Sequence, residues 1–86
     1  MRLYQVARAL DKYTGIRQVV RLPTKKPVGH VVPIPVYKLG RVHNSHWEAY
    51  WFRNPKSRRD PQPVKIAGEF SSYWAAGKAV WGIINR

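Results

Sequence analysis

Residues 47–53 read Trp-Glu-Ala-Tyr-Trp-Phe-Arg, a dense run of aromatic side chains. Aromatic residues favour strands because they fit a pleated, half-buried surface, so this run predicts a β-strand. Successive side chains of a strand alternate between the two faces of its sheet. One face would receive Tyr50 and Phe52, and the opposite face would receive Trp47, Ala49, Trp51 and Arg53. A single helix covers only one face of a small sheet, so large aromatic groups on the other face must meet solvent, a partner or the N-terminal part of the chain.

The segments around this strand predict a small sheet followed by a helix. We expect a strand at 36–42 with Gly40 at a bulge, a turn at 43–45, and a short strand at 64–66. Ser71 is the expected N-cap of a helix in which apolar residues recur at helical spacing as far as residue 84. Gly82 is expected to close or fray the last turn of that helix.

The N-terminal part predicts a β-hairpin with strands near residues 2–10 and 16–22. Residues 11–15, Asp-Lys-Tyr-Thr-Gly, have turn chemistry, since Asp caps its own backbone and Gly accepts a positive φ. The alternative is a helix over 2–12, because several apolar residues there also fit a helical stripe. Residues 23–35 contain four prolines, which forbid a helix and favour extended backbone, so this segment is expected to be a linker or an arm.

These elements together predict an α+β fold, with a small antiparallel β-sheet packed on one C-terminal α-helix. The expected parts are the N-terminal hairpin (1–22), the proline- and lysine-rich extended linker or arm (23–35), and a β-β-β-α module (36–86). With 86 residues the chain is short enough for all three parts to form one compact domain.

The charge of the chain is its most informative property for function. Lys and Arg number 16 against four acidic residues, which gives a net charge of +12. Such a balance predicts an anionic partner, and nucleic acid is the first choice. The absence of cysteine excludes disulfides, cysteine zinc sites, thiol catalysis and iron–sulfur clusters. No apolar run is long enough for a membrane span, so we expect an intracellular protein of the cytoplasm or nucleoid, or of the host cell for a viral protein, with no membrane partner.

Three short motifs in residues 36–84 give a resemblance to a known family. They are Trp-Glu-Ala-Tyr-Trp-Phe-Arg-Asn-Pro at 47–55, Ala-Gly-Glu-Phe at 67–70, and paired alanines at 75–76. This pattern resembles the plant ethylene-response-factor type of DNA-binding domain, a three-stranded antiparallel sheet on one helix. The arm-site domains of phage integrases are similar in architecture.

The resemblance implies that the sheet enters the DNA major groove. Trp51 and Arg53 would then face DNA, Tyr50 and Phe52 would face the helix, and Arg41 would contact bases or phosphates. In the third strand, the register from Gly68 would put Val64 and Ile66 on the DNA side and Lys65 against the helix.

The candidate nucleic-acid-binding residues combine positive charge with aromatic rings. Phosphates attract clusters of basic side chains, and unpaired bases stack on aromatic ones. A concentration of charge follows the aromatic strand, and a second basic patch on the hairpin and the proline-rich segment consists of Arg17, Arg21, Lys25 and Lys26. The candidates are Arg41, Trp47, Trp51, Arg53, Lys56, Arg58, Arg59, Lys25 and Lys26.

Metal binding and catalysis find little support in the sequence. His43 and His46 are near each other, but only Glu48 is an acidic neighbour, so we expect no metal site. The chain has no paired acids, no phosphate-binding Gly loop and no nucleophile motif, so we expect neither an enzyme nor a cofactor.

The leading hypothesis is therefore a DNA-binding accessory or regulatory factor, with DNA favoured over RNA. One alternative is a subunit of a ribosomal or other RNA–protein assembly, with residues 23–35 lying along the RNA. Another is a viral or mobile-element inhibitor that binds an acidic surface of a host nucleic-acid enzyme. A protein complex that contains nucleic acid is a possible partner in each case.

Overall fold

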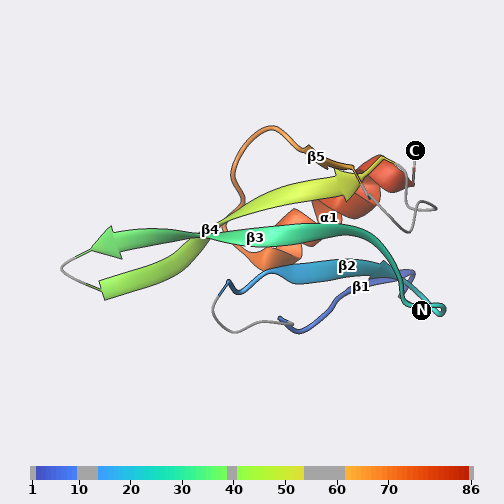
Figure 1. The fold of residues 1–86 in the computed structure, drawn as a ribbon, viewed down its shortest axis with the longest axis horizontal. Coiled ribbons are helices and arrows are strands. Elements are labelled where there is room, and N and C mark those ends of the chain that lie inside the picture. Colours follow the sequence, from blue (N-terminus) through green and yellow to red (C-terminus); the bar gives the residue numbers. More distant parts are fainter. Residues whose placement is uncertain (1, 10–13, 39–40, 54–61, 86) are drawn as a thin grey trace.

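The computed structural model describes residues 2–9, 14–38, 41–53 and 62–85, and within this part only the backbone of 35–38 and 41–45. A five-stranded antiparallel sheet packs on one C-terminal helix, which confirms the predicted α+β class (Figure 1). The elements are β1 (Tyr4–Val6), β2 (Arg17–Arg21), β3 (Lys26–Lys38), β4 (Arg41–Phe52), β5 (Pro63–Lys65) and α1 (Tyr73–Ile84).

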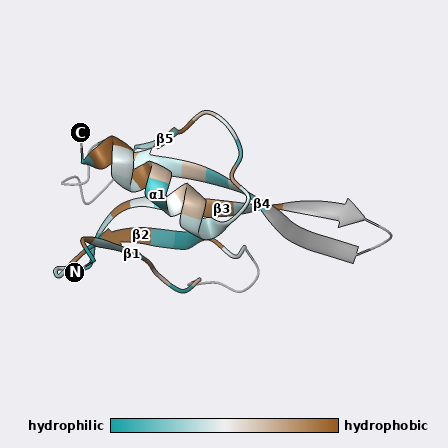
Figure 2. Cartoon of the chain, turned by 180° about the vertical axis from the view of Figure 1, so that it is seen from behind, coloured by the Kyte–Doolittle hydropathy of each residue, from teal (hydrophilic) through white to brown (hydrophobic). Residues whose placement is uncertain are grey.

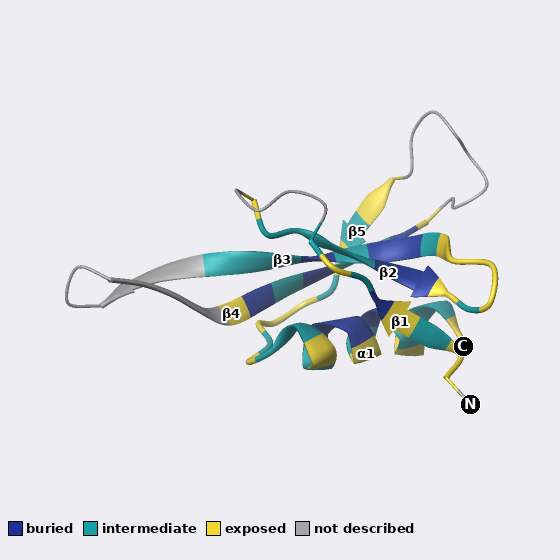
Figure 3. Cartoon of the chain, turned by 90° about the horizontal axis from the view of Figure 1, so that it is seen from below, coloured by how far each residue is buried: buried dark blue, intermediate teal, exposed yellow. Residues whose placement is uncertain are grey.

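The strands lie in the sheet in the order in which they occur in the chain, β1-β2-β3-β4-β5. The predicted N-terminal hairpin is confirmed, because β1 pairs antiparallel with β2 through Tyr4↔Arg21 and Val6↔Val19. The alternative of a helix over 2–12 is wrong for the described residues of that segment. Seen from the edge, the sheet is one layer and α1 is the other (Figure 3).

The proline-rich segment is not a linker or an arm, because residues 26–38 form β3, which lies between β2 and β4. Its backbone is extended, as predicted, but it is part of the sheet. Pro33 is tolerated because pairing with β2 stops at Val31, so no described strand pairs with that side of β3 beyond this residue. Pro33 pairs with Trp47, whose own N–H and C=O are both bonded to Phe70. Pro33 therefore needs no N–H on either side.

The strand predicted at 36–42 and the turn predicted at 43–45 are wrong. Lys38 pairs with Arg41, so residues 36–38 and 41–42 belong to two different strands, and residues 43–45 belong to β4. The bulge predicted at Gly40 lies outside the described residues. The outer parts of β3 and β4 form a two-stranded ribbon that projects beyond α1 (Figure 1). The strand predicted at 47–53 is confirmed as the last part of β4, which begins six residues earlier than predicted and ends one residue earlier. The strand predicted at 64–66 is confirmed as β5, shifted by one residue.

Helix α1 begins one residue later than predicted. The Ser72 hydroxyl, and not that of Ser71, accepts a hydrogen bond from the Ala75 N–H at 3.1 Å, which caps the first turn. Gly82 lies within the helix, which ends at Ile84 with Asn85 as its C-cap. Viewed from its own side, α1 lies across the sheet, where it packs against β1 to β4 (Figure 2).

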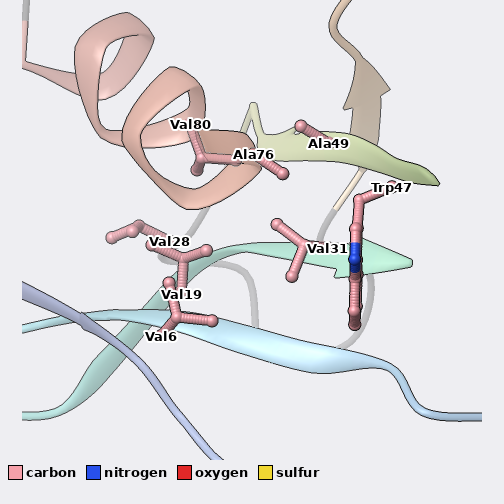
Figure 4. Close-up of a cluster of buried hydrophobic side chains, with 8 residues drawn as sticks. All are labelled: Val6, Val19, Val28, Val31, Trp47, Ala49, Ala76 and Val80. Carbon is pink, nitrogen blue, oxygen red and sulfur yellow. The ribbon is translucent and has the colours of Figure 1, made fainter. Parts of the chain in front are cut away.

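The core lies between α1 and the sheet and is built mainly of small and β-branched residues (Figure 4). Close approach of the helix requires Gly77, since a Cβ atom there would collide with the Val6 side chain. A bulge between Val19 and Val20 leaves Val28 as an extra residue in β3, and its side chain joins the core. The buried cluster consists of Val6, Val19, Val28, Val31, Trp47, Ala49, Ala76 and Val80.

Candidate nucleic-acid interface

The two tryptophans of β4 face the helix, which reverses the faces implied by the family resemblance. Trp47 is only 8% exposed, and its ring packs edge-on against Tyr73 of α1 at 5.7 Å between centroids. Trp51 is half-buried against the same core. The expectation that Trp51 faces DNA while Tyr50 and Phe52 face the helix is therefore wrong. Trp47 is part of the buried core, and Trp51 packs against that core.

Tyr50 and Phe52 lie on the opposite face of the sheet, together with His30 of β3. The His30 ring is 5.0 Å from that of Tyr50 and 5.4 Å from that of Phe52. Lys65 of β5 also lies on this face, since its Nζ pairs with the Glu48 carboxylate at 2.6 Å, which raises the pKa of Lys65. The predicted register of the third strand is wrong for the same reason, because Ile66, not Lys65, packs against the core.

Burial of His30 gives the protein a pH-dependent stability. Desolvation lowers the pKa of His30 from its usual value of 6.5, so the folded state favours the neutral ring. Below pH 6.5 the unfolded chain binds this proton more readily than the folded one, so stability falls as the pH decreases through the folded pKa. We expect the urea midpoint to drop as the pH is lowered below about 6.5, and His30→Gln to flatten that drop. If His30→Gln shows the same pH dependence of stability as the natural chain, the group whose protonation destabilises the fold is not His30.

The other predicted site residues that the structure describes come from three separate places in the fold. Arg53 is exposed at the end of β4, where its N–H bonds the Gln62 carbonyl. Lys25 and Lys26 are exposed at the connection from β2 to β3. Arg41 begins β4 at the outer end of the ribbon. Lys56, Arg58 and Arg59 lie outside the described residues, and the charge cluster predicted there stays a prediction.

A row of arginine–aromatic contacts lies where β1 and β2 meet α1. Arg17 and Arg21 were predicted to belong to a basic patch, but their aromatic partners on α1 were not predicted. The Arg17 guanidinium is 4.1 Å from the centre of the Tyr73 ring, and that of Arg2 is 5.5 Å from the Trp74 ring. The Arg21 guanidinium is 5.2 Å from the Trp81 ring, on which Tyr4 also stacks at 5.3 Å. We call this set the arginine–aromatic surface: Arg2, Tyr4, Arg17, Arg21, Tyr73, Trp74 and Trp81.

Both carboxylates of the described residues lie on the β4–β5 side of the sheet and not at this surface. The two carboxylates of the described residues both have basic neighbours there: Glu48 pairs with Lys65, and Glu69 lies 3.6 Å from His46. Lys78 is exposed on α1, one turn from both Trp74 and Trp81. The arginine–aromatic surface and its surroundings thus combine positive charge with aromatic rings, as phosphate and base contacts require.

No group of three or more His, Cys, Asp or Glu residues that could hold a metal ion occurs in the described part of the chain. Among those residues there is also no helix long and apolar enough to cross a membrane.

Comparisons with protein-family models, with curated proteins and with solved structures find no match. The family resemblance of residues 36–84 therefore stays a prediction, and the face assignment that it implied is the part that the fold corrects.

Proposed function

We propose that this protein binds nucleic acid, with DNA as the favoured ligand, and that the arginine–aromatic surface is its contact region. The observation that supports this is the alignment of three guanidinium groups with aromatic rings along the junction of α1 with β1 and β2. Arginine binds phosphate in a bidentate fashion and also stacks on aromatic faces, so one side chain serves both parts of a nucleotide.

The net charge supplies the long-range attraction for this contact. A chain of +12 is drawn to a phosphate backbone whatever the base sequence, and counterion release then makes the affinity strongly dependent on salt. The projecting β3–β4 ribbon offers a second contact, because a two-stranded ribbon fits the major groove of duplex DNA. Arg41 lies at the outer end of that ribbon, which is consistent with the contact predicted for it.

Salt-dependent binding tests this proposal directly. Anisotropy of labelled duplex DNA, single-stranded DNA and duplex RNA should report complexes that weaken steeply as salt rises. The double variant Arg2→Gln/Arg21→Gln should lower affinity on all sequences and reduce the log–log salt slope by about two, roughly one for each lost phosphate contact. Arg58→Ala/Arg59→Ala should act in the same direction if the predicted loop cluster also binds phosphate.

Lys65→Gln is the matched control, because Lys65 already pairs with Glu48 on the opposite face of the sheet. It removes one positive charge from the chain without touching the proposed surface. An equal change of slope per lost charge in Lys65→Gln and in the arginine variant would mean that the charge acts only as a diffuse field. No binding of any nucleic acid at low salt would overturn the proposed function and favour an acidic protein partner instead.

A further inference from the structure

A pocket of about 320 Å³ opens within the arginine–aromatic surface. Its walls come from the two ends of the chain, and they are Arg2, Leu3, Tyr4, Trp74 and Trp81. The volume lies at the lower end of the range of small-ligand sites, which is about 300–1,000 Å³. A pocket of this size suits one flat group better than an extended peptide.

Trp74 and Leu3 are unusually exposed for large apolar side chains. Trp74 is 47% exposed and Leu3 is 55% exposed, although both line the same pocket. Tyr73 lies beside the Trp74 ring at 5.3 Å between centroids and thereby supports it from the core side. An indole held in place and open to solvent is a preorganised stacking platform.

The charged groups around the pocket indicate that its occupant is an anion as well as a flat ring. Arg2 lies over Trp74, Arg21 lies over Trp81, and Lys78 is exposed on the helix between the two tryptophans. A second copy of this chain would bring another +12 to the contact and is disfavoured by repulsion. A nucleotide combines a flat ring with negative charge.

We propose that this pocket binds an unpaired nucleobase of a nucleic-acid strand, so that the protein prefers single-stranded nucleic acid to a duplex of the same sequence. The inference rests on the proposed function and specifies its ligand. The base stacks on Trp74, and Arg2 leaves the indole to contact the adjoining phosphate. Duplex bases are stacked on one another and cannot present a face to the indole, whereas splayed single-stranded bases can.

The test compares Trp74→Ala and Trp74→Phe with the natural chain, using a labelled oligodeoxythymidine and a labelled mixed-sequence duplex of equal length. Loss of one base stack should weaken binding to the single strand about fivefold to a hundredfold in Trp74→Ala, and should weaken duplex binding far less, because duplex bases cannot stack on the indole. Trp74→Phe keeps an aromatic face and should restore most of the affinity. Tyr50→Ala removes a half-buried aromatic group from the opposite face and is the matched control.

The outcomes separate this inference from the proposed function. Binding of both ligands with no selective loss in Trp74→Ala would overturn the stacking site and leave nucleic-acid binding intact. An equal loss in Tyr50→Ala, with both variants folded by circular dichroism, would also overturn it. Full displacement of the strand by equimolar thymidine monophosphate would mean that the pocket takes a free nucleotide instead. Failure of the natural chain to bind either oligonucleotide would overturn both proposals.

Discussion

Trp47→Ala is expected to destabilise the fold by about 3–5 kcal/mol, the usual cost of truncating a buried tryptophan. Its side chain is 8% exposed, belongs to the central buried cluster, and packs edge-on against Tyr73. Domains of this size are stable by only about 5–15 kcal/mol, so the variant loses a large share of its stability. The measurement is the urea or thermal midpoint, followed by far-ultraviolet circular dichroism.

Trp74→Ala is the matched comparison for this experiment. It removes the same side chain from a site that is 47% exposed, so its midpoint should shift far less. Trp47 was also a predicted nucleic-acid contact. A packing role predicts a loss of stability in Trp47→Ala, whereas a contact role predicts a loss of binding at unchanged stability. A Trp47→Ala variant with an unchanged midpoint and weakened DNA binding would support the contact role and contradict the packing described above.

Gly29→Ala is expected to be strongly destabilising, although it adds only one methyl group. A Cβ atom at Gly29 would collide with the Tyr50 carbonyl oxygen and would lie 2.6 Å from Cγ1 of Val80. The carbonyl belongs to the backbone of β4, so it cannot move without disturbing the ladder between β3 and β4. Overpacking of this kind costs about 1–3 kcal/mol and occasionally more. Equilibrium unfolding in urea measures the loss.

Gly82→Ala should have the opposite sign and serves as the control. Gly82 is exposed within α1, and no atom outside the helix's own backbone lies within 4 Å of a Cβ placed there. Alanine favours a helix interior by about 1 kcal/mol over glycine, so the midpoint should rise. A rise in both midpoints would mean that Gly29 is not packed as closely against β4 and α1 as described.

Local chemistry was sufficient to predict the hairpin of β1 and β2, the aromatic part of β4, and α1. Each has a signal confined to a few residues: the turn at 11–15, the aromatic run, or the helical spacing after residue 70. The prediction failed where the secondary structure that a residue can adopt depends on its neighbours in space and not on those in sequence. Pro33 is compatible with a strand only because pairing with β2 stops at Val31 and because the Trp47 backbone bonds to Phe70. No pattern within the proline-rich segment contains that information.

The site was less accessible to sequence reasoning than the fold. Alternation correctly divided the side chains of β4 into two sets, but it could not say which set the helix covers. The resemblance assigned the faces, and Trp47 and Trp51 were therefore expected on the open side. The arginine–aromatic surface joins Arg2 to Trp74 and Arg21 to Trp81, residues from the two ends of the chain. These contacts depend on the tertiary packing of β1 and β2 against α1, which no local sequence pattern specifies.

The order of the strands has a consequence for how the protein assembles. Each strand pairs with its neighbour in the chain, so every step of sheet formation closes a short loop at small entropic cost. The contact of Tyr4 with Trp81 instead closes nearly the whole chain, and it rests on a three-residue edge strand. Such a junction is the kind of region that opens first in a native protein. A ligand that contacts both β1 and α1 would stabilise this junction. Ligand binding and the docking of β1 on α1 would therefore be thermodynamically coupled.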